Sequence, residues 1–232
     1  MDILRAAVES GVNFLDTADV YGGGRSEQLI GKFLKENPDE LFVATKLGRR
    51  DHMFPDNFTP ANLRGCTEDS LKHLGVESLD LTQLHCLPTE VLRRGEIFDE
   101  MRKLQEAGLI RHWGVSVESM EEALICLEQD GLTSLQIIFN VFRRKPAEIL
   151  FEKAKAMNIA IIVRLPLASG LLSGKLSPDS TFSENDHRGF NADGQFFNVG
   201  ETFAGLGLDK GTELADELKQ FVPEGMSMAT MA

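Results

Sequence analysis

The sequence has little that would suit an extracellular, membrane-bound or nucleic-acid-binding protein. Its three cysteines are odd in number and have no CxxC spacing, which fits reduced thiols in a cytosol better than a disulfide framework. No apolar run approaches the length of a membrane span, and the N-terminus has no signal-peptide pattern. The net charge of −12 disfavours contact with phosphate backbones and anionic lipid. We therefore predict a cytoplasmic protein with no nucleic-acid partner and no membrane partner.

Tyrosine is the scarcest of the side chains that can transfer a proton. The chain has fifteen phenylalanines but one tyrosine, Tyr21, so it uses phenylalanine almost wherever ring packing alone is needed. Tyr21 stands five residues after Asp16 in the stretch NFLDTADVYGGGRSE, residues 13–27. This stretch is typical of the end of a strand and the loop that follows it. The position raises the question of what a phenol does there that a phenyl ring could not.

Short apolar strands alternate with amphipathic helices along most of the chain. The helices have clear boundaries: Thr59 begins one that runs to Leu74, and Ser119 with Glu122 has the spacing of a capping box. Pro146 is typical of the first turn of a further helix. The predicted strands cover residues 12–18, 41–47, 79–85, 112–117, 134–140 and 159–166.

This alternation predicts an α/β fold with a parallel sheet covered by helices. A doubly wound dinucleotide-binding sheet would place GxGxxG directly after the first strand, and YGGGRSE (residues 21–27) lacks that spacing. No phosphate-binding Walker motif is present either. Six regular strand–helix steps without a reversal favour a (β/α)8 TIM barrel, of which this chain would hold about six of the eight units.

No linker divides the chain, so we expect residues 1–232 to form a single domain, truncated at both ends. Residues 1–11 open directly on a helical pattern, and residues 226–232 stop within one. Six strands would leave two exposed edges in a barrel built for eight, so the chain is either a fragment of a longer gene product or an open arc of low stability. We interpret it as the fragment, because both termini interrupt helical patterns. Residues 177–211 interrupt the regular pattern, and a loop of that length is usually functional, often a lid.

Four titratable residues fall at or just after the carboxyl ends of successive predicted strands: Asp16, Tyr21, Lys46 and His85. In a parallel barrel these ends share one face, where the catalytic residues of barrel enzymes lie. Taken singly, the aspartate could cap a turn, the tyrosine could be a half-buried aromatic, and the histidine could be a satisfied core residue. Lys46 is harder to explain, because a buried ammonium needs a partner. Asp16, on the adjacent strand, is the natural one.

Together the four suit proton transfer to a carbonyl oxygen. A free phenol has a pKa of about 10, and a nearby ammonium favours the phenolate and makes the phenol a better acid. A carboxylate keeps the ammonium charged and in place, and a histidine on the next strand can donate a hydrogen bond to the substrate oxygen. Phenylalanine at position 21 could do none of this.

The stretch GVNFLDTADVYGGGRSEQLIGKFL (11–34) and the segment LDLTQLH (79–85) resemble the signatures of the aldo-keto reductases. The resemblance implies an NADPH-dependent barrel enzyme that reduces an aldehyde or ketone to an alcohol, with hydride from the nicotinamide and a proton from Tyr21. Asp16, Lys46 and His85 would complete the catalytic tetrad. Contacts to NADPH (NADP⁺) are implied for Ser116, Gln136, Arg164, Pro166, Leu167, Ser169, Gly170, Leu172, Gly174 and Lys175.

The sequence departs from the family pattern in three ways. Val117 stands where an asparagine usually contacts the nicotinamide carboxamide, and Arg164 stands where many members stack an aromatic ring. Arginine can also stack, through its planar guanidinium. The family's first strand and its last strand–helix units have no counterpart in this sequence. In the family, those last units normally bind the adenosine ribose.

Two other functions are compatible with the same barrel. One is a non-catalytic regulatory subunit that senses the cofactor, although such proteins carry asparagine at the place of His85. The other is an inactive fragment. His52, His73 and His112 show no metal-ligand spacing, so we predict no metal site, and His187 reads as a surface residue.

Overall fold

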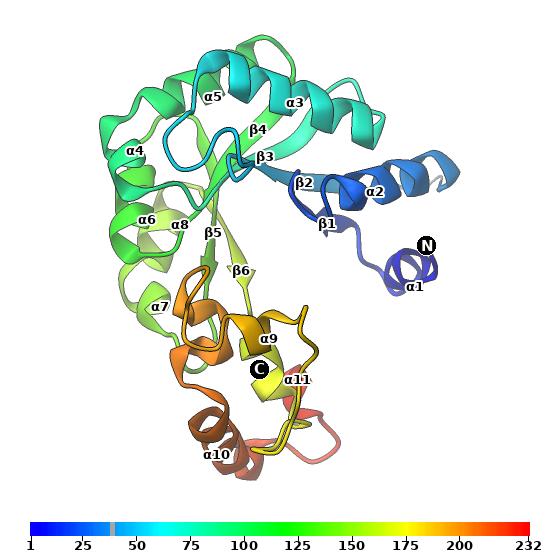
Figure 1. Ribbon diagram of the computed structural model, residues 1–232, viewed down its shortest axis with the longest axis vertical. Helices are drawn as coiled ribbons and strands as arrows, with labels where there is room; N and C mark the ends of the chain where they lie inside the picture. The colour runs from blue at the N-terminus through cyan, green and yellow to red at the C-terminus, as the bar shows by residue number, and fades with distance from the viewer. Residues whose placement is uncertain (38–39) are drawn as a thin grey trace. The chain divides into compact units, whose positions relative to one another are not determined.

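The computed structural model describes residues 1–37 and 40–232 (Figure 1). In these ranges, six strands form one sheet whose spatial order is the same as their order in the chain. Strands β1 to β4 pair in parallel. The bounds are β1 (Phe14–Asp16), β2 (Phe42–Leu47), β3 (Leu79–His85), β4 (Ile110–Ser116), β5 (Leu132–Ile138) and β6 (Ala160–Arg164).

Helices connect the strands, as the alternating pattern predicted. They are α1 (Asp2–Glu9), α2 (Arg25–Glu36), α3 (Pro60–Leu74), α4 (Thr89–Arg94), α5 (Glu96–Glu106), α6 (Met120–Leu127), α7 (Lys145–Ile149), α8 (Phe151–Ala156), α9 (His187–Phe190), α10 (Leu208–Leu218) and α11 (Met228–Met231). Short 3₁₀ turns add η1 (Ala168–Ser173), η2 (Val199–Glu201), η3 (Phe203–Gly205) and η4 (Lys219–Phe221). No helix in the described ranges is both long and apolar enough to cross a membrane.

The predicted helix boundaries at α3 and α6 are confirmed. The Thr59 side chain accepts a hydrogen bond from the backbone N–H of Asn62 and begins α3. Ser119 and Glu122 form the predicted capping box at the start of α6. The helix predicted after Pro146 is instead divided into α7 and α8, with the fully buried Leu150 between them.

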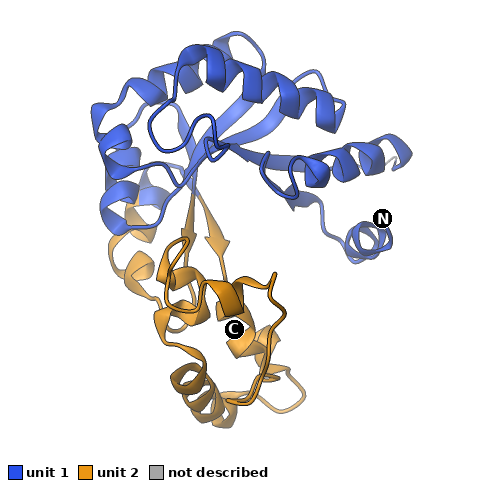
Figure 2. Cartoon of the chain, viewed as in Figure 1, with its two compact units in different colours: residues 1–135, 154–160 blue, residues 136–153, 161–232 orange. Residues whose placement is uncertain are grey.

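The chain divides into two compact units (Figure 2). Unit 1 comprises residues 1–135 and 154–160, and unit 2 comprises residues 136–153 and 161–232. In unit 1, Trp113 on β4 is fully buried and its indole lies 5.9 Å from the ring of Phe98, centroid to centroid. Unit 2 has its own apolar cluster, made of Ala168, Leu171, Leu172, Phe203, Ala204, Ala215 and Met228.

The segment predicted as one long loop, residues 177–211, contains α9, η2, η3 and the start of α10. Asn191 organises its middle part: the side-chain oxygen accepts from the backbone N–H groups of Phe196 and Phe197, and the amide nitrogen donates to Thr202. The sequence pattern could not predict these turns, because hydrogen bonds of side chains such as Asn191 stabilise them and leave no apolar periodicity in the sequence. A role as a lid stays a prediction.

Candidate active site

Strands β1, β2 and β3 bring the candidate catalytic residues to one edge of the sheet in unit 1. Asp16 pairs in register with Ala44, two residues before Lys46, and Lys46 pairs with Gln83, two residues before His85. Because the strands are parallel, their carboxyl ends lie at the same edge. The side chains of three successive strands therefore converge there, as the sequence predicted.

Lys46 and Asp16 form an ion pair. The Lys46 Nζ atom donates to Asp16 Oδ1 at 2.5 Å and to the backbone oxygen of Thr17 at 2.7 Å. The Lys46 side chain is 1% exposed, whereas that of Asp16 is 35% exposed. The predicted pairing is confirmed. A buried ammonium in contact with a carboxylate keeps its charge, so the pair places a fixed cation at the strand ends.

Tyr21 lies beside this cation. The Lys46 Nζ atom is 5.1 Å from the centroid of the Tyr21 ring. The imidazole of His85 lies edge-on to the same ring, with 5.9 Å between centroids and 82° between planes. Tyr21 is 43% exposed, so its ring is open to solvent. The structure thus gathers all four predicted residues, and their catalytic roles stay predictions.

Two further polar groups at this edge were missed by the sequence interpretation. Gln83 is fully buried, and its Nε2 lies 3.4 Å from Asp16 Oδ2. Arg49 donates to the backbone oxygen of Cys86 at 3.4 Å, next to His85. Gln83 lies two residues before His85 on β3, and residues i and i+2 of a strand share a face. The alternation of side chains along the strand could therefore have identified Gln83.

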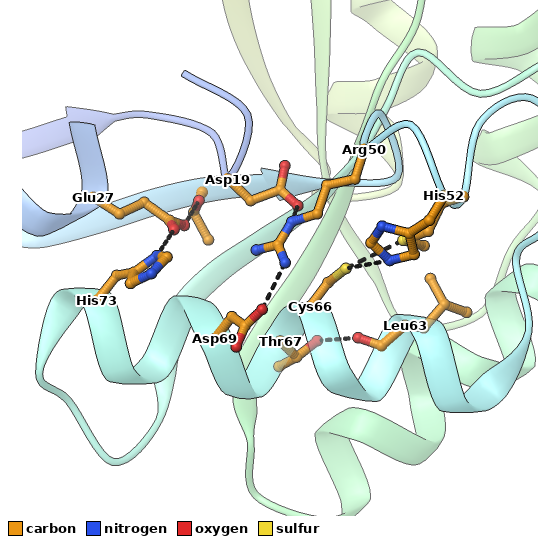
Figure 3. A network of polar contacts seen from close by, with 11 residues as sticks. Asp19, Glu27, Arg50, His52, Leu63, Cys66, Thr67, Asp69 and His73 are labelled. Atoms are coloured by element: carbon orange, nitrogen blue, oxygen red, sulfur yellow. Dashed lines mark hydrogen bonds and ion pairs between the residues drawn. The ribbon is translucent and has the colours of Figure 1, made fainter. Parts of the chain in front are cut away.

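The glycine-rich loop after Tyr21 leads into α2, which is fixed by a buried carboxylate (Figure 3). Gly22, Gly23 and Gly24 all have positive φ, which lets the chain turn sharply into the helix. Glu27 then accepts a hydrogen bond from Thr45 Oγ1 at 2.6 Å and lies 3.0 Å from His73 Nδ1. His73, on α3, therefore links that helix to Glu27 on α2.

The predicted cofactor contacts are divided between the two units. Ser116 ends β4 in unit 1 and is buried, with its hydroxyl 3.5 Å from the Cys86 sulfur. The others lie in unit 2. Gln136 is buried on β5, and Arg164, at the end of β6, forms an ion pair with Glu201.

The loop of unit 2 predicted to contact the cofactor, residues 166–175, contains η1. Its backbone turns through left-handed conformations at Ala168, Ser169, Gly170 and Gly174. The Ser169 hydroxyl donates to the backbone oxygen of Glu201 at 2.7 Å and accepts from the Phe203 N–H at 3.1 Å. Of the remaining predicted contacts, Pro166 and Lys175 are exposed, Leu167 is half-buried and Leu172 is buried.

Across residues 1–37 and 40–232, no group of three or more His, Cys, Asp or Glu side chains is placed to hold a metal ion.

A parallel sheet in chain order defines a barrel-type α/β protein, and the candidate site lies where its strands end. The sequence model of the Aldo/keto reductase family matches residues 1–232, and the chain belongs to this family. Curated relatives include "Probable aldo-keto reductase 1" from Glycine max, 34% identical over 179 residues, and "Aldo-keto reductase YhdN" from Bacillus subtilis, 33% identical over 192 residues. These alignments cover 75% and 81% of this chain but 51% and 58% of the relatives, so the chain spans little more than half their length.

Solved structures agree on the fold. The glycerol dehydrogenase AKR11B4 from Gluconobacter oxydans is 33% identical, with a TM-score of 0.74, and the alignment covers 97% of this chain and 68% of that one. An aldo/keto reductase from Klebsiella pneumoniae, solved in complex with NADP and acetate, is 25% identical, with a TM-score of 0.62 over 89% of this chain and 68% of that one. The fold is therefore that of the (β/α)8 TIM barrel, and the described residues contribute six of its strands.

The unequal burial of Asp16 and Lys46 predicts unequal effects on stability. Asp16→Asn leaves a buried ammonium facing a neutral amide, and we expect a loss of about 2 kcal/mol. That is below the usual cost of breaking a buried pair, because Asp16 is one-third exposed. Lys46→Met removes the buried charge itself and should change stability by less than about 1 kcal/mol. Urea unfolding followed by Trp113 fluorescence measures both, and the opposite order would contradict the argument.

Proposed function

We propose that this chain carries the catalytic centre of an NADPH-dependent oxidoreductase that reduces an aldehyde or ketone to an alcohol. The observation that carries the proposal is the Asp16–Lys46 ion pair beside the ring of Tyr21, with His85 at the edge of that ring. A phenol next to a fixed cation is the arrangement that proton donation to a developing alkoxide requires.

Each residue has one task in this mechanism. Tyr21 gives its hydroxyl proton to the carbonyl oxygen, and Lys46 stabilises the phenolate that is left. Asp16 holds the ammonium in place, and His85 donates a hydrogen bond that aims the substrate oxygen. The nicotinamide, when bound, supplies the hydride to the carbonyl carbon. Because Tyr21 is open to solvent, water can return the proton after the alcohol leaves.

The residues of unit 2 fit an anionic nucleotide. Residues 168–170 all have left-handed backbone conformations, which turn the chain sharply at this point. The exposed ammonium of Lys175 follows the turn. We propose that residues 166–175 contact the pyrophosphate, and that Gln136 and Arg164 contact the nicotinamide. A relative from Klebsiella pneumoniae, crystallised with NADP, supports this choice of cofactor.

The test is isotopic. The 232-residue chain is incubated with NADPH carrying deuterium at both positions of C4 of the nicotinamide and with a reactive aldehyde such as 4-nitrobenzaldehyde. We expect deuterium on the carbinol carbon of the product, detected by mass spectrometry. NADPH that binds, measured by fluorescence titration, but transfers no deuterium would favour the non-catalytic cofactor sensor. Failure to bind at all would favour an inactive fragment.

A further inference from the structure

Asp19, Arg50 and Asp69 form a second group of charges in unit 1 (Figure 3). Arg50, on the loop after β2, donates from Nε to Asp19 Oδ2 at 2.8 Å and from Nη1 to Asp69 Oδ2 at 2.6 Å. Asp19 stands two residues before Tyr21, and Asp69 is on α3. One guanidinium thus connects three segments: the β1–α2 loop, the β2–α3 loop and helix α3.

Asp19 is also fastened through its backbone. Its N–H donates to the backbone oxygen of Lys46 at 3.0 Å, extending the β1–β2 pairing beyond the end of β1. The chain then turns, and the Tyr21 N–H donates to the backbone oxygen of Ala18 at 3.1 Å. Asp19 is therefore the last point at which the loop is fixed to the Lys46 strand before the phenol.

Burial makes the Asp19 carboxylate unusual. Its side chain is fully buried, Arg50 is mostly buried and Asp69 is exposed. Asp19 Oδ1 has no hydrogen-bond partner among the described residues. A buried carboxylate is costly, and a neutral side chain of the same size would fill the space without that cost. The charge therefore calls for an explanation beyond packing.

We propose that Asp19 and Arg50 are positioning residues that hold the Tyr21 loop against the Lys46 strand, so that the phenol keeps its place beside the ammonium. This inference rests on the proposed function, because it assigns the pair to the same reaction. Arg50 supplies the attachment to α3 through Asp69, and Asp19 transmits it to the loop.

The surroundings of Asp19 make this contact sensitive to pH. Burial raises the pKa of Asp19 from 3.8 to about 6, against the opposing effect of Arg50, and the nearby carboxylate of Glu27 adds to the rise. Burial likewise raises the pKa of the Cys66 thiol, on α3, to about 11, so that thiol is neutral at pH 7. His73 faces Glu27. Asp19 is thus charged at pH 7 and takes up a proton as the pH falls through about 6.

Activity and stability respond to this proton in opposite ways. Because the pKa of Asp19 is higher in the folded chain, its contribution to stability is fully present below pH 3.8 and is lost as the pH rises through about 6. The ion pair with Arg50 needs the charged form. Above pH 6, the ion pair of Asp19 with Arg50 therefore holds the loop in place for catalysis. In the same pH range the stabilising contribution of the Asp19 proton is lost, so the fold is less stable.

The single tyrosine allows a direct test. Tyrosine labelled with ¹³C in the ring gives one set of ring signals in this chain, all from Tyr21. The spectra are recorded in a His85→Gln background, because the His85 imidazole lies against the Tyr21 ring and a histidine also responds to pH in this range. Between pH 5 and 8 we expect the Tyr21 ring signals in this background to show a transition with a midpoint near 6. Asp19→Asn, which keeps the shape but not the charge, should lack this transition and lose about tenfold to a hundredfold in kcat/KM at pH 7, with NADPH affinity unchanged.

The matched control is Glu68→Gln. Glu68 forms an exposed ion pair with Arg64 on the same helix, one residue from Asp69. This variant should retain both the parental transition and the parental kcat/KM, since exposed pairs contribute little. A parental transition and parental kcat/KM in Asp19→Asn would overturn the proposal.

If Asp19→Asn fails to fold by circular dichroism, Arg50→Lys decides. Lysine keeps a cation but cannot reach both carboxylates, so it should fold and still lower kcat/KM about tenfold; unchanged kcat/KM would overturn the proposal. The two proposals fail separately. A fully active Tyr21→Phe variant would overturn the proposed function, whereas an inactive Tyr21→Phe beside a fully active Asp19→Asn would remove only this inference.

Discussion

Replacing Tyr21 with phenylalanine is expected to lower kcat/KM for carbonyl reduction by about 10²- to 10⁴-fold, the range that a positioned general acid contributes. The change removes one hydroxyl from a ring that is 43% exposed, so the fold should be unaffected. Phenylalanine keeps the edge contact with His85 but has no proton to give. Single-turnover absorbance measurements with NADPH and a reactive aldehyde give the rate, and circular dichroism checks the fold.

A double variant separates proton donation from a structural effect. If Lys46 acts through the phenol, Lys46→Met should lower kcat/KM strongly in the parent and have little further effect once Tyr21 is phenylalanine. Independent losses that multiply in the double variant would show that Lys46 acts elsewhere. Parental activity in Tyr21→Phe alone would remove the proposed mechanism.

Much of this site could be predicted from the sequence, because the evidence for it is local. A lysine within the apolar stretch LFVATKL needs an acid, and Asp16 lies at the end of the preceding predicted strand. Parallel pairing then makes the strand ends neighbours without further information. The pairing of Lys46 with Asp16 and the placing of Tyr21 and His85 beside them follow from this rule.

The contacts of Asp19, Arg50 and Asp69 could not be predicted in the same way. They join three segments whose separation depends on how α3 lies against the loops, and no periodicity records that packing. Some predicted strand boundaries also differ from the observed ones. Strand β5 begins at Leu132 rather than at residue 134, because the chain becomes extended directly after Gly131, where φ is +84°. The glycine thus ends the segment before β5 two residues earlier than the pattern of apolar residues predicted.

The second large effect is expected on stability, from Gly31→Ala in α2. A Cβ at this position would lie 2.3 Å from the backbone oxygen of His73 and 2.8 Å from backbone atoms of Leu74. Backbone atoms at the end of α3 cannot move aside as a flexible side chain can, so the two helices must separate. We expect a loss of about 3 kcal/mol or more, at or beyond the upper end of the usual cost of overpacking. Separation would also stretch the contact between Glu27 and His73.

Gly65→Ala, in α3, is the matched control, because a Cβ there meets nothing within 4 Å. Alanine in the interior of a helix is favoured over glycine by about 0.5–1 kcal/mol, so this variant should be more stable than the parent. The single tryptophan, Trp113, is fully buried, and it lies in unit 1, as do both glycines. Its fluorescence in urea therefore reports the unfolding of that unit. Equal midpoints for the two variants would mean that α2 and α3 do not pack closely enough at Gly31 to exclude a methyl group.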